Sequence, residues 1–141
     1  MTARAGIRHL TTALAVLLLA AACSNLAAST GTERDRIAAA AHTQVQTVRL
    51  VAEAALEDPP APTVTLTVVL DDARTELTGL REDLAGLPGG LGELPTLVDD
   101  SLALLGLVQS TINDGRRQEL HDLRRTAEEI AAMLADRSET L

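Results

Sequence analysis

The chain has 141 residues, a length typical of a single domain with enough residues to bury a core. Apolar residues make up 46% of it, yet Phe, Tyr, Trp and Lys are all absent, and its formal net charge is −8. An acidic surface repels phosphate backbones and a chain without aromatic rings offers no base-stacking platform, so the composition argues against nucleic acid as a partner.

The first 22 residues have the layout of a secretory signal peptide. Arg4 and Arg8 form a positive start, residues 13–22 are an unbroken apolar run, and that run ends in three alanines. A helix that spans a bilayer needs about 20 apolar residues, and the polar Asn25 ends this run too early. The pattern predicts that the protein is exported and that residues 1–22 are removed.

The only cysteine, Cys23, follows directly after that run. The segment Leu19-Ala20-Ala21-Ala22-Cys23 resembles the lipobox of bacterial lipoproteins, in which leucine is commonest where Ala20 stands. The resemblance covers residues 1–23 only. It implies that Cys23 receives a thioether-linked diacylglyceryl group and becomes the first mature residue, anchored to the outer face of the cytoplasmic membrane. The alternative is ordinary cleavage after Ala22, which would leave a free thiol.

Residues 23–32 are predicted to be the lipidated cysteine and a short tether, and residues 33–141 a separate helical domain. The nine small and mostly polar residues 24–32, SNLAASTGT, span at most about 30 Å. All twenty acidic residues and ten of the twelve arginines follow Cys23, so the mature chain carries a formal charge of −10. We therefore expect an acidic domain held close to the membrane.

The first helix of that domain is predicted over residues 33–57. Thr32 is the expected N-cap, with Asp35 three residues further on. Mostly apolar residues recur at spacings of four and three, which predicts one buried face. That face consists of Ile37, Ala41, Gln44, Val48, Val51 and Ala55. The segment EDPPAP, residues 57–62, ends the helix because proline cannot continue the hydrogen-bond ladder.

The second helix carries the strongest pattern, a leucine seam with strict spacings of four and three residues. The seam consists of Leu66, Leu70, Ala73, Leu77, Leu80, Leu84 and Leu87. Residues 63–68 also alternate like a strand, but no second strand-like run exists to pair with them. We therefore predict a helix from about Thr65, ended by the glycine-rich and proline-rich residues 86–95.

A third helix is predicted from Thr96, with Asp99 three residues further on. Its predicted buried residues are Val98, Leu102, Leu105, Val108 and Ile112. Those of the segment after Asn113-Asp114-Gly115 are Leu120, Leu123, Ala127, Ile130 and Leu134. The two sets are out of helical phase. Continuing the first set by four residues would place Arg116 at a buried position, which is costly for a charge. This change of phase predicts a turn after Asn113 and a fourth helix to Ser138.

The predicted fold class is therefore all-α, a small antiparallel helical bundle of four helices or of three with a kinked last helix. One unbroken helix over residues 96–138 would measure about 64 Å, far longer than its partners. We favour four short helices for that reason.

No catalytic, metal-binding or cofactor-binding pattern stands out. A di-iron bundle would need Glu three residues before His, but Ala39 precedes His42 and Gln118 precedes His121 at that spacing. The adjacent acid pairs of the chain point about 100° apart on a helix, so neither member of a pair readily joins the other at one site. We predict that the protein is not an enzyme, holds no metal and needs no cofactor.

Four arginines on and before the last helix form a candidate patch for an anionic partner or phospholipid headgroups: Arg116, Arg117, Arg124 and Arg125. The alternative is that they flank the buried face as ion pairs at helical spacing, Arg124 with Glu128 and Arg125 with Glu129.

The function predicted from these features is that of a membrane-anchored bacterial envelope lipoprotein with a non-catalytic interaction or scaffold domain. Its leucine seam or an exposed helix face would bind a protein partner or a second copy. The alternative is a carrier whose aliphatic interior, which has no aromatic side chains, binds a lipid-like ligand.

Overall fold

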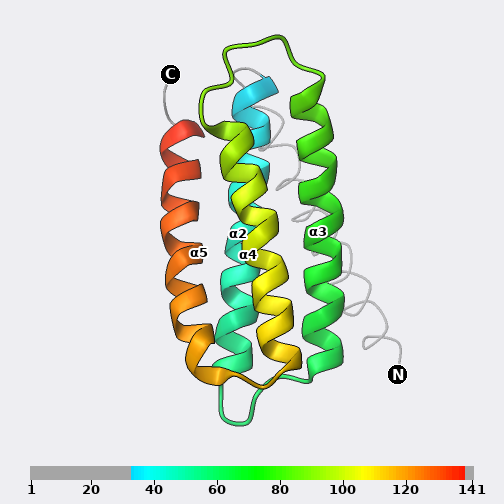
Figure 1. The fold of residues 1–141 in the computed structure, drawn as a ribbon, viewed down its shortest axis with the longest axis vertical. Coiled ribbons are helices and arrows are strands. Elements are labelled where there is room, and N and C mark those ends of the chain that lie inside the picture. Colours follow the sequence, from blue (N-terminus) through cyan, green and yellow to red (C-terminus); the bar gives the residue numbers. More distant parts are fainter. Residues whose placement is uncertain (1–32, 139–141) are drawn as a thin grey trace, which may run out of the picture. The chain divides into compact units, whose positions relative to one another are not determined.

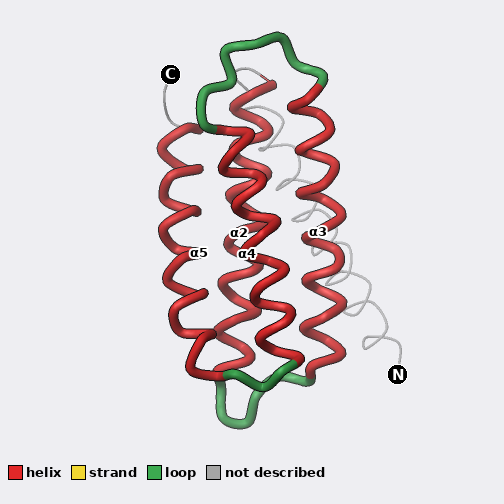
Figure 2. Tube along the Cα trace, viewed as in Figure 1, coloured by secondary structure: helices red, strands yellow, loops and turns green. Residues whose placement is uncertain are grey.

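The computed structural model describes residues 33–138, which form four α-helices joined by short loops (Figures 1 and 2). The helices are α2 (Glu33–Leu56), α3 (Thr63–Ala85), α4 (Leu94–Asn113) and α5 (Arg117–Ser138). Consecutive helices run antiparallel, so the all-α prediction is confirmed, with four separate helices rather than three. The predicted signal peptide, Cys23, the tether and the Thr32 cap lie outside the described residues.

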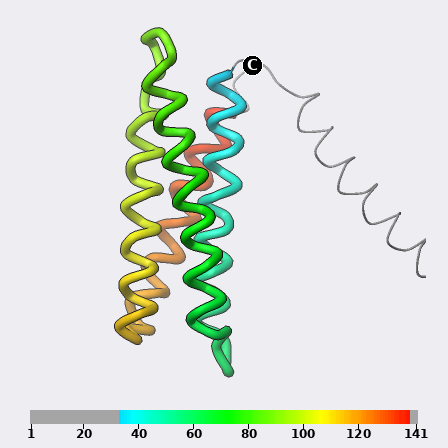
Figure 3. The backbone as a smooth tube through the Cα atoms, turned by 90° about the vertical axis from the view of Figure 1, so that its right-hand side faces the viewer, coloured from blue at the N-terminus to red at the C-terminus, as the bar shows by residue number. Residues whose placement is uncertain are grey.

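The four helices pack around one core, with α4 in front of α2 at the centre of Figure 1 and α5 and α3 on either side. Helices α2 and α4 lie diagonally opposite and still contact each other, whereas α3 and α5 make no contact (Figures 1 and 3). The most extensive interface joins α2 to α5, the first and last helices of the bundle. The loops after α2 and α4 lie at one end, and the loop between α3 and α4 lies at the other (Figure 2).

The leucine seam of α3 is buried inside this bundle. Its six helical members are the only buried residues of α3, and Leu87, beyond the end of the helix, is half-buried. They are Leu66, Leu70, Ala73, Leu77, Leu80 and Leu84. The seam therefore serves the core of its own chain.

Helix α3 begins at Thr63, two residues before the predicted start. Pro62 precedes it with φ −58° and ψ 130°, and the Pro62 carbonyl accepts a hydrogen bond from the Leu66 N–H at 3.2 Å. Because the first helical residues need no intrahelical acceptor for their own N–H groups, helix can follow proline directly. The strand-like alternation of residues 63–68 is thus an outward-facing Thr and Val pattern on a helix.

The predicted faces of the other helices are wrong at several positions because each face is wider than one seam. In α2 Gln44 is half-buried and its neighbour Val45 is buried. Leu102, Ile112 and Leu123 are likewise only half-buried. The buried residues that the seams missed include Ala38, Val45, Ala52, Leu94, Leu97, Ser101, Leu104, Thr111 and Ala131. Helices α2 and α4 each pack against three others, so their buried stripes exceed a narrow coiled-coil seam.

The start of α4 also differs from the prediction. The helix begins at Leu94, two residues before the predicted start at Thr96, with Glu93 at the N-cap position. Pro95 lies in the first turn, where its fixed φ suits a helix and its missing N–H costs no bond.

The predicted turn between α4 and α5 is confirmed as a Schellman motif. The Arg116 N–H donates to the Thr111 carbonyl at 3.1 Å, and the Gly115 N–H donates to the Ile112 carbonyl at 3.2 Å. Gly115 adopts φ +68°, a conformation that costs other residues energy because of their Cβ atom. The turn resets the helical phase and leaves Arg116 exposed.

The core is one cluster of aliphatic side chains that draws on all four helices. Its larger members are mainly leucine and valine, while its alanines are concentrated on α2 and α5. Those alanines are Ala38, Ala41, Ala52, Ala55, Ala127 and Ala131. Small side chains let helix axes approach closely, which fits the extensive contact between α2 and α5.

Candidate functional site

The predicted lipidation site and the two histidines give no chemical site within the described residues. Cys23 lies outside them. His42 is half-buried, with its Nε2 3.5 Å from the Gln46 side-chain nitrogen, and His121 is exposed on α5. Among residues 33–138 no group of three or more His, Cys, Asp or Glu side chains is placed to hold a metal ion.

The structure gives Arg116 and Arg117 separate partners at the end of the bundle opposite residues 86–93. Arg116 forms ion pairs with Asp114 at 3.1 Å and with Glu119 at 2.7 Å. Arg117 reaches from the start of α5 to the end of α2, where its Nη2 donates to the carbonyls of Leu56 and Glu57. A guanidinium at a helix C-terminus satisfies carbonyls that have no intrahelical donor.

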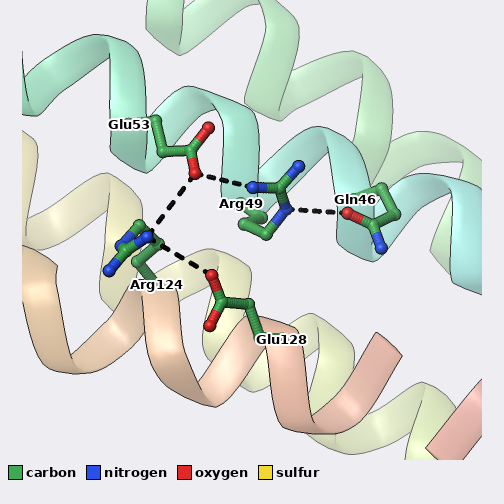
Figure 4. A network of polar contacts seen from close by, with 5 residues as sticks. All are labelled: Gln46, Arg49, Glu53, Arg124 and Glu128. Atoms are coloured by element: carbon green, nitrogen blue, oxygen red, sulfur yellow. Dashed lines mark hydrogen bonds and ion pairs between the residues drawn. The ribbon is translucent and has the colours of Figure 1, made fainter. Parts of the chain in front are cut away.

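Arg124 belongs to a polar network that joins α5 to α2 (Figure 4). Its Nη1 lies 3.6 Å from an oxygen of Glu53 and 3.3 Å from an oxygen of Glu128. The same Glu53 oxygen accepts a hydrogen bond from Arg49 at 2.6 Å, and Arg49 donates to Gln46 at 2.8 Å. Glu53 therefore lies between two arginines, one from each helix.

One of the two predicted ion pairs of α5 is present as expected, that of Arg124 with Glu128. Arg125 instead contacts Asp122, one turn earlier, at 2.8 Å. All four patch arginines thus have acceptors within their own chain. An anionic ligand would have to compete with these acceptors, so the geometry favours structural ion pairs over a ready binding patch.

Replacing Glu53 with glutamine is expected to lower the free energy of unfolding by about 1 kcal/mol, because Arg49 and Arg124 lose the carboxylate that they share. The measurement is urea-induced unfolding followed by far-UV circular dichroism. Glu76→Gln, a matched change at an exposed position of α3, should stay within about 0.5 kcal/mol of the wild type. In 1 M salt the effect of the Glu53 change should shrink. Equal losses for the two variants would show that the network adds no stability.

Two other arginines contact the loop between α3 and α4, and a third contacts the last turn of α3. Arg34, in the first turn of α2, donates from Nη1 to the Gly90 carbonyl at 3.1 Å. Arg137, near the end of α5, pairs with Glu93. Arg36 pairs with Glu33 and lies 3.4 Å from Asp83 at the end of α3. The start of α2, the end of α5 and residues 86–93 therefore form one end of the bundle, which we call the loop end.

The Arg36 contact changes the acidity of its partner. The hydrogen bond from Arg36, assisted by its positive charge, lowers the pKa of Glu33 below its ordinary value, and the same contact raises the pKa of Arg36. A lowered carboxyl pKa favours the folded state above the ordinary titration range, and this contribution is lost as the pH falls through the lowered pKa. Both groups are exposed, so the contact is a surface ion pair of the loop end.

Charge is distributed unevenly over the bundle. Helices α3 and α4 together carry seven acidic residues and two arginines, whereas α2 and α5 carry eight acidic residues and seven arginines. One side of the bundle is therefore strongly acidic and the other nearly balanced. The acidic side lies away from the four patch arginines, which belong to α5 and the turn before it.

Large exposed apolar side chains are spread over all four helices: Leu50, Val64, Val68, Leu107 and Met133. Only Val64 and Val68 share a helix face, one turn apart at the start of α3, and Val64 is 77% exposed. Scattered apolar residues are normal on a protein surface. The distribution does not single out one docking face.

Within the described part of the chain, no helix combines the length and hydropathy needed to cross a bilayer. Comparison of the chain with family models, curated proteins and solved structures finds no match.

Proposed function

We propose that this protein is an exported lipoprotein whose Cys23 carries a diacylglyceryl anchor and whose helical bundle is a non-catalytic interaction or scaffold domain at the membrane surface. The observation that carries the proposal is the position of the only cysteine, directly after an apolar run and small residues that resemble a lipobox. Two acyl chains provide stable anchoring, at about 0.8 kcal/mol for each buried methylene group.

The packing of the bundle limits which of its surfaces could bind a partner. Its leucine seam packs inside the chain, so a partner would bind the outward faces instead. Those faces are rich in charge, with the net negative charge concentrated on α3 and α4. No observation on the described residues favours the carrier alternative, because their apolar side chains form one continuous core.

The anchor is tested by replacing Cys23 with serine, which keeps the size of the side chain and removes its nucleophilic sulfur. The wild-type chain expressed in a bacterial host is expected to incorporate labelled palmitate and to yield a product that starts at Cys23 and bears a diacylglyceryl group. Cys23→Ser should incorporate no label. Ser24→Ala, the matched control next to it, should be labelled like the wild type.

Intact-mass analysis decides between the two kinds of processing. A secreted product that begins at residue 23 with a free thiol would contradict the lipoprotein proposal and support ordinary cleavage. Native mass spectrometry of the Cys23→Ala chain then tests the role of the domain. A defined oligomer supports self-association, whereas a co-purifying apolar ligand would support the carrier alternative.

A further inference from the structure

The loop end differs chemically from the rest of the surface. Residues 86–92, GLPGGLG, contain no charged or hydrogen-bonding side chain. The opposite end presents residues 57–62, which begin with Glu57 and Asp58, and the turn at Asp114. The side of the bundle formed by α3 and α4 is strongly acidic, and the side formed by α2 and α5 is nearly balanced. At the loop end, Glu33, Asp83 and Glu93 are paired with arginines, so residues 86–92 are an uncharged stretch that can approach headgroups with little repulsion.

The loop end is also where the described chain begins. Arg34 donates to the Gly90 carbonyl, and a Cβ atom on Gly92 would lie 3.8 Å from Arg34 Nη2. The loop is thus in contact with the first turn of α2, and nine residues separate that helix from Cys23. Nine residues span at most about 30 Å. Because α4 runs away from the loop for about 30 Å, the opposite end lies that much further from the start of α2.

We propose that the loop formed by residues 86–92 is the surface of the domain that meets the lipid bilayer, so that the four helices project away from the membrane. Connectivity brings this end closest to the anchor, and residues 86–92 carry no charge that a headgroup would repel. The acidic faces of α3 and α4 and the turns at the opposite end then face the surroundings. The inference rests on the lipidation of Cys23 proposed above.

The experiment uses the lipidated full-length chain, in which Cys23 is modified and an introduced cysteine becomes the only free thiol. Three variants place that thiol at increasing distance from the loop: Gly89→Cys, Gly106→Cys and Asn113→Cys. A Cβ atom at Gly89 or Gly106 meets nothing within 4 Å, and Asn113 is exposed at the end of α4. Each thiol is labelled with the same small fluorophore.

The labelled proteins are reconstituted into phosphatidylcholine vesicles that contain a lipid with a nitroxide quencher on its headgroup. We expect several-fold stronger quenching at residue 89 than at residue 113, with residue 106 between them. Equal quenching at the three positions, or the reverse order, would overturn the inference. Pro88→Cys repeats the test at the loop in case Gly89→Cys disturbs the fold, which circular dichroism reports.

Flotation of the same vesicles separates this inference from the proposal beneath it. If the protein floats with the vesicles and the quenching shows no gradient, the anchoring stands and the orientation is wrong. If the protein does not float and Cys23 is unmodified by mass, the anchoring and the orientation fail together. The unanchored Cys23→Ser, Gly89→Cys chain should show little quenching, because residues 86–92 carry no charge that attracts them to lipid.

Discussion

Replacing Leu77 with alanine is expected to lower the free energy of unfolding by about 3 kcal/mol. Leu77 lies in the middle of the α3 seam and is 0% exposed. Truncation removes the transfer free energy of the buried methyl groups and leaves a cavity that the surrounding helices fill only in part. The loss is measured by urea-induced unfolding. Far-UV circular dichroism is the appropriate signal, because the chain has no aromatic side chain to report on packing.

Leu107→Ala is the matched control for this change. Leu107 is also a helical leucine, on α4, but it is 56% exposed. Its truncation should cost less than about 0.5 kcal/mol in the monomeric domain. A loss at Leu107 as large as that at Leu77 would contradict the assignment of the core, and a loss that grows with protein concentration would show that this face is covered by a second copy.

Replacing Ala52 with leucine is expected to lower the free energy of unfolding by about 2 kcal/mol. Ala52 is completely buried on α2, the helix with the most extensive interfaces in the bundle. Added methylene groups at a packed position force neighbouring side chains out of their rotamers or push helices apart. The same unfolding measurement applies, and the midpoint should fall without a large change in the denaturant dependence.

Ala103→Leu places the same side chain on the exposed face of α4 and should be nearly neutral. If Ala52→Leu were instead neutral or stabilising, the core around α2 would contain unfilled space. That result would revive the carrier alternative, since a bundle with spare interior volume could bind an apolar ligand.

Sequence periodicity predicted the buried face of a helix well where that face is a single narrow stripe. The seam from Leu66 to Leu84 is correct at every position because α3 buries a single narrow stripe. Prediction failed at Gln44 and Val45, where α2 packs against three other helices and the stripe is wider than the seam. The start of α4 was misplaced because Pro95 was treated as a break, although proline is accepted in a first helical turn.

The candidate arginine patch shows which ion pairs can be predicted from sequence spacing and which cannot. The Arg124 to Glu128 pair follows from helical spacing alone. The contacts of Arg124 with Glu53 and of Arg117 with the carbonyl of Leu56 depend on how α5 packs against α2. No local pattern encodes such contacts, so they emerge only once the bundle is assembled.

The pairing of α2 with α5 affects when the domain can fold. The largest interface joins the segments furthest apart in sequence, so it forms only after the intervening loops have closed. A chain synthesised from its N-terminus can therefore form α2, α3 and α4 early, but it lacks the partner that completes the core until the 22 residues of α5 emerge. Folding of this domain is then a late event of synthesis, and loss of α5 would disable the whole bundle.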